Sequence, residues 1–328
     1  MHTAFVLAAG FGTRLRPLTN HVPKPLVPVC GIPMLAYALA LCSRHGLTKV
    51  VVNSHWLAET LEPWAGSHEG VEVTISKEQP EILGTGGGLK LVAKQLADRF
   101  AIVNADVLSD VDLKALMSAV PDGGAAMALR SGPTDQYGVV AADSTAIVTK
   151  LVAVASAPAS GEVALDTHFT GIHAMTRDSL KHVPDGFAGI VRTAYKQIVP
   201  QRLVGAIRHE GVWLDVGDPE AYLETNLIVL SGGVRLSIDP MPRAAWARSG
   251  DRSFGDAAKV VGAMIRKNAW IGNGATVDGA TIENSVVGAN ATVPADTVLV
   301  DSVVWDGCTV PQGVHERVVI HPGGCLQI

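Results

Sequence analysis

The sequence predicts an α/β domain with a mainly parallel sheet, followed by a short parallel β-helix. Three observations predict this fold class. Short apolar runs alternate with helical stretches up to about residue 230. The first apolar run leads into a glycine-rich loop near residue 10. Beyond about residue 260, aliphatic residues recur every five or six positions.

The first part of the chain, 1–230, alternates between strands and helices. In chain order, the pattern predicts a strand at 3–8, a helix at 33–45, a strand at 50–52, a helix at 56–65, a strand at 71–75, a helix at 86–97 and a strand at 101–103. This spacing is typical of βαβ units, in which ligands bind beyond the carboxyl ends of the parallel strands. Gly10 and Asp106 both follow such ends, which connects them to one site.

The chain changes character after residue 230. A glycine pair and two prolines make 231–258 an irregular connector. The β-helix is expected at 259–328, where about three coils would carry one inward aliphatic residue per repeat: Ile265, Ile271, Val277, Ile282, Val287, Val293, Val298, Val304 and Val310. Of the paired valines 286–287 and 303–304, one per pair is left for a partner surface. We therefore expect this domain to assemble a homo-oligomer and not to catalyse.

Composition excludes several classes of protein. The 328 residues are 48% hydrophobic and 17% charged, which describes a globular chain rather than a disordered one. A net charge of -5 argues against a general nucleic-acid binder, which needs a basic surface. The N-terminus has no basic leader, and no apolar run reaches the roughly 18 residues of a membrane span. Four scattered cysteines favour neither disulfides nor a zinc site. We expect a cytoplasmic protein.

The loop after the first strand carries the chemistry. Without a Cβ at Gly10 and Gly12, a nucleotide can lie against the backbone, and Arg14 and Lys24 supply the cations that a triphosphate needs. Leu15 stands where a dinucleotide fingerprint has its third glycine, and no Gly-Lys-Ser/Thr closes a Walker A loop. The two informative segments read LAAGFGTRLRPLT at 7–19 and PKPLVPV at 23–29.

Together these segments resemble the signature of the sugar nucleotidyltransferases, which include mannose-1-phosphate guanylyltransferases and glucose-1-phosphate thymidylyl- and adenylyltransferases. The resemblance continues in EILGTGGG at 81–88, VNAD at 103–106 and WLDVGDPEAYL at 213–223. It implies a Rossmann-like enzyme that transfers a nucleoside monophosphate from an NTP to a sugar 1-phosphate and releases pyrophosphate. It assigns catalytic phosphate contacts to Arg14 and Lys24. It assigns nucleotide contacts to Leu7, Ala9, Gly10, Gly12, Thr13, Arg14, Lys24, Gly84 and Gly86.

The resemblance also implies a Mg²⁺ ion held by Asp106 and Asp215, whose hard carboxylate oxygens suit this ion. The strand-end residue Asp106 can instead be a helix cap, and Asp215 can instead be a turn residue, so each assignment depends on its motif. The attacking sugar-phosphate oxygen is already anionic and needs alignment and relief from charge repulsion rather than a strong base. Arg14 and Lys24 would stabilise charge on the departing pyrophosphate.

One stretch departs from the family pattern. Many members carry a Glu-Lys-Pro whose lysine holds the sugar phosphate, whereas residues 149–155 read TKLVAVA here. Lys150 is the candidate substitute, with Gly138 and Gly171 in the implied sugar-phosphate site, and a solvated surface lysine is the alternative. The stretch is similarly degenerate in N-acetylmuramate-1-phosphate uridylyltransferases, which the chain also resembles at 52–58 and 169–172. Those enzymes as a rule lack a β-helix.

The substrates remain open at this stage. The architecture favours GTP and mannose 1-phosphate, and the hexapeptide resemblance implies a left-handed β-helix. UTP or dTTP with another hexose, N-acetylhexosamine or muramate 1-phosphate is the alternative, because base and sugar discrimination depends on a few loop contacts. A non-catalytic regulatory subunit is the alternative from another class. The intact residues Arg14, Lys24, Asp106 and Asp215 speak against it.

Overall fold

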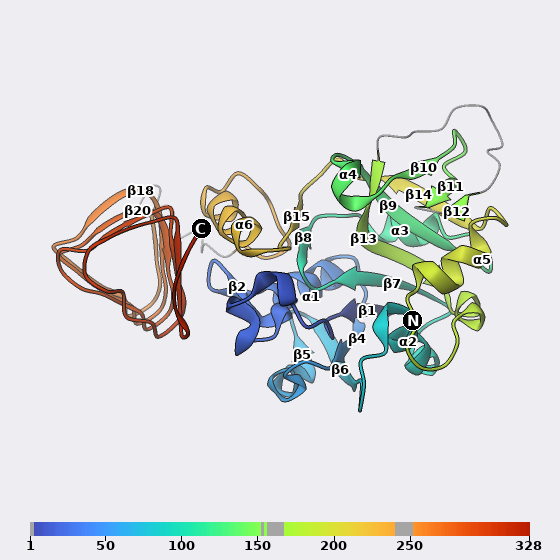
Figure 1. The fold of residues 1–328 in the computed structure, drawn as a ribbon, viewed down its shortest axis with the longest axis horizontal. Coiled ribbons are helices and arrows are strands. Elements are labelled where there is room, and N and C mark those ends of the chain that lie inside the picture. Colours follow the sequence, from blue (N-terminus) through green and yellow to red (C-terminus); the bar gives the residue numbers. More distant parts are fainter. Residues whose placement is uncertain (1–2, 152–153, 156–166, 240–251) are drawn as a thin grey trace. The chain divides into compact units, whose positions relative to one another are not determined.

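The computed structural model describes residues 3–151, 154–155, 167–239 and 252–328. The chain divides into two compact units, which Figure 1 shows coloured along the sequence. The first unit comprises the chain up to Phe11 together with 38–213, and the second comprises 12–37 together with 214–328. The segment that carries Arg14 and Lys24 therefore belongs to the same unit as the C-terminal part of the chain.

An 11-stranded sheet organises the first unit. The strand order is β12-β11-β10-β13-β7-β1-β4-β6-β5, with β9 paired to β13 and β14 paired to β9. At its centre, β7, β1, β4 and β6 run parallel. The strands are β1 (Thr3–Leu7), β4 (Lys49–Ser54), β5 (Gly66–His68), β6 (Val71–Lys77), β7 (Arg99–Asn104), β9 (Ala125–Ser131), β10 (Val140–Ala142), β11 (Val148–Leu151), β12 (Val154–Ala155), β13 (Thr167–Thr176) and β14 (Val204–Arg208).

The central strands match the expected positions because their β-branched residues are buried on both faces of the sheet. Phe5, Phe100 and Ile102 lie in the core cluster of this unit. The remaining elements before the C-terminal part are α1 (Met34–Arg44), α2 (Gly84–Leu91), α3 (Leu113–Ser118), α4 (Thr134–Tyr137), α5 (Lys196–Ile198), β8 (Val107–Ser109) and β15 (Trp213–Asp215).

Two predicted helices differ from the structure. The helix expected at 56–65 is wrong, because that segment forms two short 3-10 turns at Ala58–Thr60 and Glu62–Trp64. Pro63 has no N–H to continue a helix, and Leu57 has a left-handed φ of 50°. The helix expected at 86–97 begins at Gly84 and ends at Leu91, and a 3-10 turn at Ala93–Gln95 follows it.

A buried hydrogen-bond network joins the carboxyl ends of the central strands. Asn53, at the end of β4, accepts a hydrogen bond from the N–H of Ala8 (2.6 Å) and donates one to Glu78 Oε1 (2.8 Å). The other carboxylate oxygen of Glu78 accepts the N–H of Leu83, at the start of α2 (2.6 Å). Glu78 is 0% exposed, and a Cβ at Gly88 would overlap its carboxylate. One side-chain pair thus positions the first loop and the start of α2.

The second unit contains a hairpin, a long helix and a β-helix. The hairpin consists of β2 (Pro28–Val29) and β3 (Ile32–Pro33), and α6 spans Pro219–Leu230. Seen along its axis, the β-helix is triangular (Figure 1). Its strands are β16 (Arg252–Phe254), β17 (Lys259–Val261), β18 (Met264–Ile271), β19 (Thr276–Asp278), β20 (Thr281–Val287), β21 (Thr292–Val293), β22 (Val298–Val300), β23 (Val303–Val304), β24 (Val314–Glu316), β25 (Val318–His321) and β26 (Gly324–Gln327).

The corners of the coils repeat every 16 or 17 residues. At each corner a residue has a positive φ, and the series are Ala257, Gly274, Asn290 and Gly307; Gly262, Gly279 and Asp296; and Lys267, Asn284, Asp301 and Arg317. Asparagine, aspartate and glycine tolerate this backbone conformation best, which explains the composition between the aliphatic positions. The predicted fold class is confirmed.

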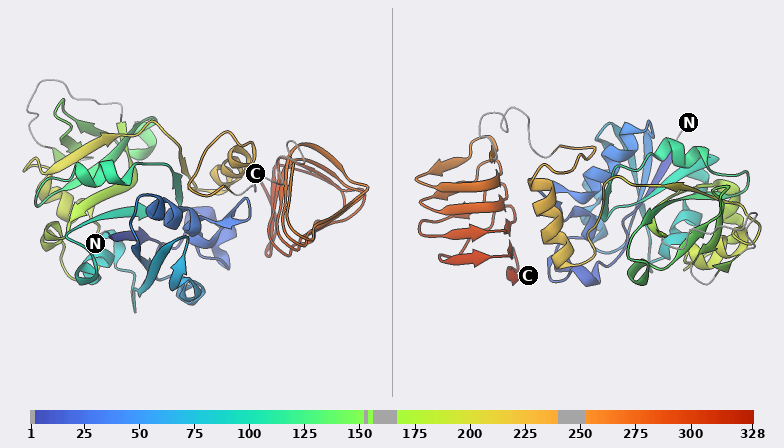
Figure 2. Two further views of the ribbon diagram at one scale, coloured as in Figure 1. Left: turned by 180° about the vertical axis from the view of Figure 1, so that it is seen from behind. Right: turned by 90° about the horizontal axis from the view of Figure 1, so that it is seen from above.

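Two details of the β-helix prediction need correction. On one face β16, β18, β20, β23 and β25 pair in parallel, so the stack is taller than the three coils expected. The valines at 286, 287, 303 and 304 are all buried, at 2% exposed or less. Helix α6 packs against β18 and β20 and lies along the stacked strands (Figure 2), so these valines do not form a free partner surface.

Among the residues that the structure describes, no helix is both long enough and apolar enough to span a bilayer. The longest described helices, α1 and α6, have 11 and 12 residues.

The network around Glu78 yields a stability prediction. Glu78→Ala should lower the free energy of unfolding by about 3 kcal/mol, because the buried amide of Asn53 and the half-buried N–H of Leu83 lose their acceptor. Glu78→Gln should cost about 1–3 kcal/mol, since its amide places a donor opposite another donor. Urea unfolding followed by tryptophan fluorescence measures both. The control is Glu81→Gln on the exposed loop nearby. Wild-type stability of Glu78→Gln would contradict the role of the network.

Candidate active site

In the second unit, the predicted phosphate loop is held by its own side chains. Gly12 has a left-handed φ of 62°, and its carbonyl accepts a hydrogen bond from Thr19 Oγ1 (2.8 Å). A Cβ at Gly12 would lie 3.0 Å from Thr19 Cγ2 and 3.2 Å from Lys24 Cβ. The glycine is therefore required by backbone conformation and by packing, and not only by ligand approach as the sequence suggested. Thr13 begins the 3-10 turn that carries Arg14.

Arg14 and Asp215 lie beside the same point of the chain. A Cβ at Gly217 would be 3.5 Å from Arg14 Nη1 and 3.6 Å from Asp215 Oδ2. The guanidinium side chain is exposed, and the aspartate is half-buried. The structure thus brings together one predicted phosphate contact and one predicted metal ligand. Lys24 is only 9% exposed, in the 3-10 turn Lys24–Leu26.

Other aspartates cap the helices that follow the two motif aspartates, which bears on the helix-cap alternative for Asp106. Asp112 caps α3, where its carboxylate accepts the N–H groups of Lys114 and Ala115 (both 2.9 Å). Asp218 caps α6 by accepting the N–H of Ala221 (2.9 Å). Neither Asp106 nor Asp215 is the N-cap residue of these two helices.

In the first unit, Leu7 and Asp106 belong to neighbouring strand ends. Leu7 pairs with Asn104, and the carbonyl of Leu7 accepts the N–H of Ala105 (3.1 Å). Asp106 follows directly and is half-buried. Gly171 lies in an irregular part of β13 with a φ of 81°, and a Cβ there would be 2.5 Å from Asn104 Nδ2. Gly171 therefore leaves space for the side chain next to the Asp106 turn.

The first loop is open at Gly10. A Cβ at Gly10 would meet no atom within 4 Å, and the residue is exposed, as a ligand-approach surface requires. Ala9, one residue earlier, is buried. Phe11 is 39% exposed and packs against His55 and Trp56, with ring centroids 5.4 Å and 5.9 Å away.

The predicted nucleotide contacts Gly84 and Gly86 pack closely against another loop. A Cβ at Gly84 or Gly86 would lie 2.9 Å or 3.0 Å from the carbonyl oxygen of Ala188. The same oxygen accepts the N–H of Gly86 (2.7 Å), and Thr85 Oγ1 accepts the N–H of Ile190 (3.0 Å). Close packing of α2 on this loop gives a structural reason for the glycines that the motif alone did not reveal.

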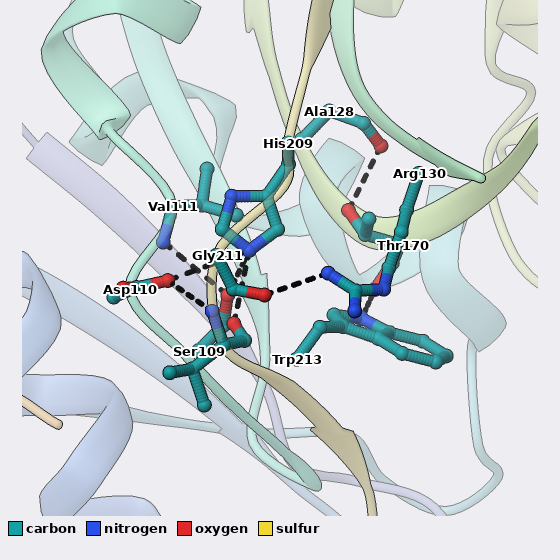
Figure 3. Close-up of polar contacts among 10 residues, drawn as sticks. Ser109, Asp110, Val111, Ala128, Arg130, Thr170, His209, Gly211 and Trp213 are labelled. Atoms are coloured by element: carbon teal, nitrogen blue, oxygen red, sulfur yellow. Dashed lines mark hydrogen bonds and ion pairs between the residues drawn. The ribbon is translucent and has the colours of Figure 1, made fainter. Parts of the chain in front are cut away.

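A clamp connects the chain after Asp106 with the chain before Asp215 (Figure 3). Asp110 Oδ1 accepts the N–H of Val212 (2.7 Å), and Val212 O accepts the N–H of Asp110 (3.3 Å). His209 Nε2 lies 2.9 Å from Val212 O, and Arg130 Nη1 donates to Gly211 O (2.6 Å). A Cβ at Gly211 would overlap the Asp110 carboxylate. Sequence reasoning missed this clamp because none of its residues belongs to a recognised motif.

An aromatic cluster lies beside the clamp. The rings of Tyr137 and His168 stack at 4.8 Å, and both contact Trp213, at 5.1 Å and 4.9 Å. Trp213 Nε1 donates to Thr170 O (2.8 Å). Trp213 therefore packs against these rings, and the cluster adjoins Gly138 in sequence. Gly138 follows Tyr137 of the cluster, and Gly171 follows Thr170, whose carbonyl accepts the hydrogen bond from Trp213.

Lys150 lies on β11, where it pairs with Ala141 of β10 and Ala155 of β12. Its side chain is exposed. This position agrees with the solvated-lysine alternative and leaves the sugar-phosphate role a prediction.

Several histidines have satisfied polar contacts. His55 Nδ1 lies 2.8 Å from Glu78 O, and His315 Nε2 lies 2.7 Å from Pro311 O. His173 Nδ1 lies 2.7 Å from the hydroxyl of Tyr195. Burial lowers the pKa of His173 to about 3, so this imidazole is neutral at physiological pH.

Two family models match the chain, one in each of its two predicted parts. Residues 3–232 match the family described as Nucleotidyl transferase, and residues 255–325 match the one described as GlmU-like, C-terminal hexapeptide. A probable mannose-1-phosphate guanylyltransferase of Oryza sativa subsp. japonica is 28% identical over 323 residues, 95% of this chain and 82% of the relative. The mannose-1-phosphate guanylyltransferase of Mycobacterium tuberculosis is 28% identical over 326 residues, 96% and 83%.

Other relatives match a shorter part. A UTP–glucose-1-phosphate uridylyltransferase of Synechocystis is 29% identical over 253 residues, 71% of this chain and 64% of the relative. The crystal structure of HddC from Yersinia pseudotuberculosis complexed with GMP-PN has a TM-score of 0.55 at 20% identity, and covers 69% of this chain and 98% of that one. It shares the fold. These matches confirm the resemblance carried by the motifs: the chain belongs to the nucleotidyl transferase family, among relatives that act on sugar 1-phosphates.

Proposed function

We propose that the protein transfers GMP from GTP to mannose 1-phosphate, forming GDP-mannose and releasing pyrophosphate. One observation carries this choice of substrates. The matches to the mannose-1-phosphate guanylyltransferases of Oryza sativa and Mycobacterium tuberculosis extend over 95% and 96% of the chain and so include the β-helix, whereas the match to the uridylyltransferase covers 71%. The combination of both parts is what the chain has in common with these two guanylyltransferases.

In this proposal Arg14 and Lys24 bind the triphosphate and stabilise charge on the departing pyrophosphate. The exposed guanidinium of Arg14 beside Gly217 supports this role, because an accessible cation there can reach a substrate oxygen. Further nucleotide contacts are assigned to Leu7, Ala9, Gly10, Gly12, Thr13, Gly84 and Gly86, and sugar-phosphate contacts to Gly138, Lys150 and Gly171. The open space at Gly10 supports its assignment.

Asp106 and Asp215 are the proposed ligands of Mg²⁺. Both are half-buried carboxylates, and two such groups suit an ion that usually keeps waters and binds substrate phosphates. Among the described residues, no three His, Cys, Asp or Glu side chains gather to hold a metal, so its other ligands would be water and substrate oxygens. When bound, the ion would supply charge neutralisation for the reacting phosphates.

A UTP- or dTTP-dependent enzyme that acts on another hexose, N-acetylhexosamine or muramate 1-phosphate is the alternative. The 29% identity to a uridylyltransferase and the missing Glu-Lys-Pro at 149–155 favour it. A regulatory subunit without activity is the non-enzyme alternative. For a homo-oligomer through the β-helix, the remaining candidate surface is apolar and exposed, at Val261 (64%), Met264 (51%) and Val314 (75%).

A pyrophosphate-release screen decides among these functions. GTP, ATP, UTP, CTP and dTTP are each paired with mannose, glucose, N-acetylglucosamine and N-acetylmuramate 1-phosphates in the presence of Mg²⁺. We expect the highest kcat/KM for GTP with mannose 1-phosphate. A preference for UTP or dTTP would replace the proposed substrates, and no turnover with any pair would favour the regulatory subunit.

The metal assignment predicts that Asp106→Asn and Asp215→Asn each abolish Mg²⁺-dependent turnover while the protein stays folded. Each change removes a charged ligand and preserves size. The matched controls are Asp112→Asn and Asp218→Asn, which keep their helix caps because asparagine caps as well as aspartate. Activity near the wild-type level in Asp106→Asn or Asp215→Asn, measured across a Mg²⁺ titration, would rule out that ligand.

The phosphate loop predicts that Arg14→Ala lowers kcat by about two orders of magnitude, since an electrostatic contact to the transition state is worth roughly 3 kcal/mol. Steady-state kinetics at saturating Mg²⁺ measure the change. Arg16→Ala, an exposed arginine two residues further on, should retain near-normal kcat. A rise in the KM for the triphosphate with unchanged kcat would show that Arg14 binds the ground state only.

A further inference from the structure

Within the second unit, a chain of buried hydrogen bonds runs from the β-helix to the hairpin that follows Lys24. Trp305 Nε1, in the β-helix, donates to the hydroxyl of Tyr222 on α6 (2.9 Å). That hydroxyl donates in turn to the carbonyl of Pro28, in β2 (2.7 Å). Tyr222 is 0% and Trp305 5% exposed, so water does not compete for these groups. Burial raises the pKa of Tyr222, which keeps its hydroxyl protonated and able to donate.

A second set of contacts holds the turn of the same hairpin. Asn226 of α6 accepts the N–H of Cys30 through Oδ1 (2.8 Å) and donates through Nδ2 to Tyr222 O (2.9 Å). Cys30 is buried and has a left-handed φ of 45°, which a non-glycine residue adopts only when its surroundings hold it. A Cβ at Gly31 would overlap the ring of Trp270, in β18.

The backbone between this hairpin and Lys24 is short and stiff. Lys24–Leu26 is a 3-10 turn in which the N–H of Val27 bonds to Lys24 O (3.1 Å). Prolines at 23, 25 and 28 fix φ on both sides of the lysine. The N–H of Met34 bonds to Val27 O (3.1 Å), which closes the hairpin onto the turn. A displacement of Pro28 is therefore transmitted to Lys24 with little freedom to absorb it.

We propose that the β-helix positions the triphosphate-binding lysine: Trp305, through Tyr222, and Trp270, through Gly31, hold the 28–33 hairpin and thereby Lys24. Tyr222, Asn226, Trp270 and Trp305 are positioning residues in this proposal, and Lys24 is the group that touches substrate. The proposal rests on the proposed function for the role of Lys24. It replaces the expectation that the β-helix serves assembly alone, because its tryptophans support the hairpin within a single chain.

Tyr222→Phe in the full-length protein is the decisive variant. It deletes one oxygen atom, keeps the ring, and leaves Pro28 O without its donor. We expect amide hydrogen exchange at Val27 and Cys30 to become at least about tenfold faster, because a lost buried hydrogen bond lowers local stability. We also expect the KM for the triphosphate to rise, or kcat to fall, by about tenfold. The KM for the sugar 1-phosphate should stay within twofold.

The control is Arg317→Ala. Arg317 also connects the β-helix with α6, through Glu224 (2.8 Å) and Glu220 (3.4 Å), but its ion pairs are exposed and do not touch the hairpin. Arg317→Ala should leave amide exchange at Val27 and Cys30, and the kcat and KM values, near those of the wild type. Trp305→Phe should reproduce Tyr222→Phe more weakly, since the tyrosine hydroxyl can still donate to Pro28 O.

Distinct outcomes separate the two proposals. Unchanged exchange at Val27 and Cys30 in Tyr222→Phe would overturn the mechanical connection, whatever the activity. Faster exchange at Val27 and Cys30 in Tyr222→Phe, with kcat and both KM values unchanged, would overturn the connection between the hairpin and Lys24. A fall in kcat with the KM of both substrates unchanged, matched by a smaller active fraction on titration, would show a merely structural role. If the wild-type protein transfers no nucleotide while exchange in Tyr222→Phe is faster than in the wild type, the proposed function and the role of Lys24 would be overturned.

Discussion

The carboxylate of Glu78 has no access to water, and the loops around the predicted nucleotide site depend on its hydrogen bonds. Through Asn53 it fixes the N–H of Ala8, and directly it fixes the N–H of Leu83. The first group stands at the beginning of the Gly10 loop, and the second stands at the start of α2. Gly10 itself is exposed, as its proposed contact with a nucleotide requires. The buried pair of Asn53 and Glu78 thus positions the backbone on which the Gly10 loop begins.

The second unit follows the same physical rule with different residues. Tyr222 and Asn226 reach from α6 to backbone groups of the 28–33 hairpin, as Glu78 reaches to the start of α2. In both units, side chains of neighbouring strands and helices help to position the loops that carry predicted substrate contacts. Loops rich in glycine and proline have few side chains with which to hold themselves, so buried polar groups outside the loop add to internal contacts such as that of Thr19 with Gly12 O.

Motifs and periodicity predicted the fold class, the family and the strand ends that carry Gly10 and Asp106, because these features are written locally in the chain. The partnership of Asn53 with Glu78 was not predictable, since it depends on the register of β4 with β6. The burial of Val286 was missed for a similar reason: its strand, β20, packs against α6, and the repeat pattern does not say what covers a β-helix face. Roles assigned from motifs, including that of Lys150, remain predictions.

The repeat of the β-helix has a consequence for how its length can vary. Trp270 pairs with Val286, and Val286 pairs with Val303, so Trp270 and the strand before Trp305 stand two rungs apart. Each rung adds about 4.8 Å to the stack. One tryptophan meets Gly31 and the other Tyr222, so the number of rungs between them has to match the fixed separation of the hairpin turn and the middle of α6. A coil deleted between the two tryptophans would put one of them out of reach of its partner. The stack thus acts as a spacer of defined length between these two contacts.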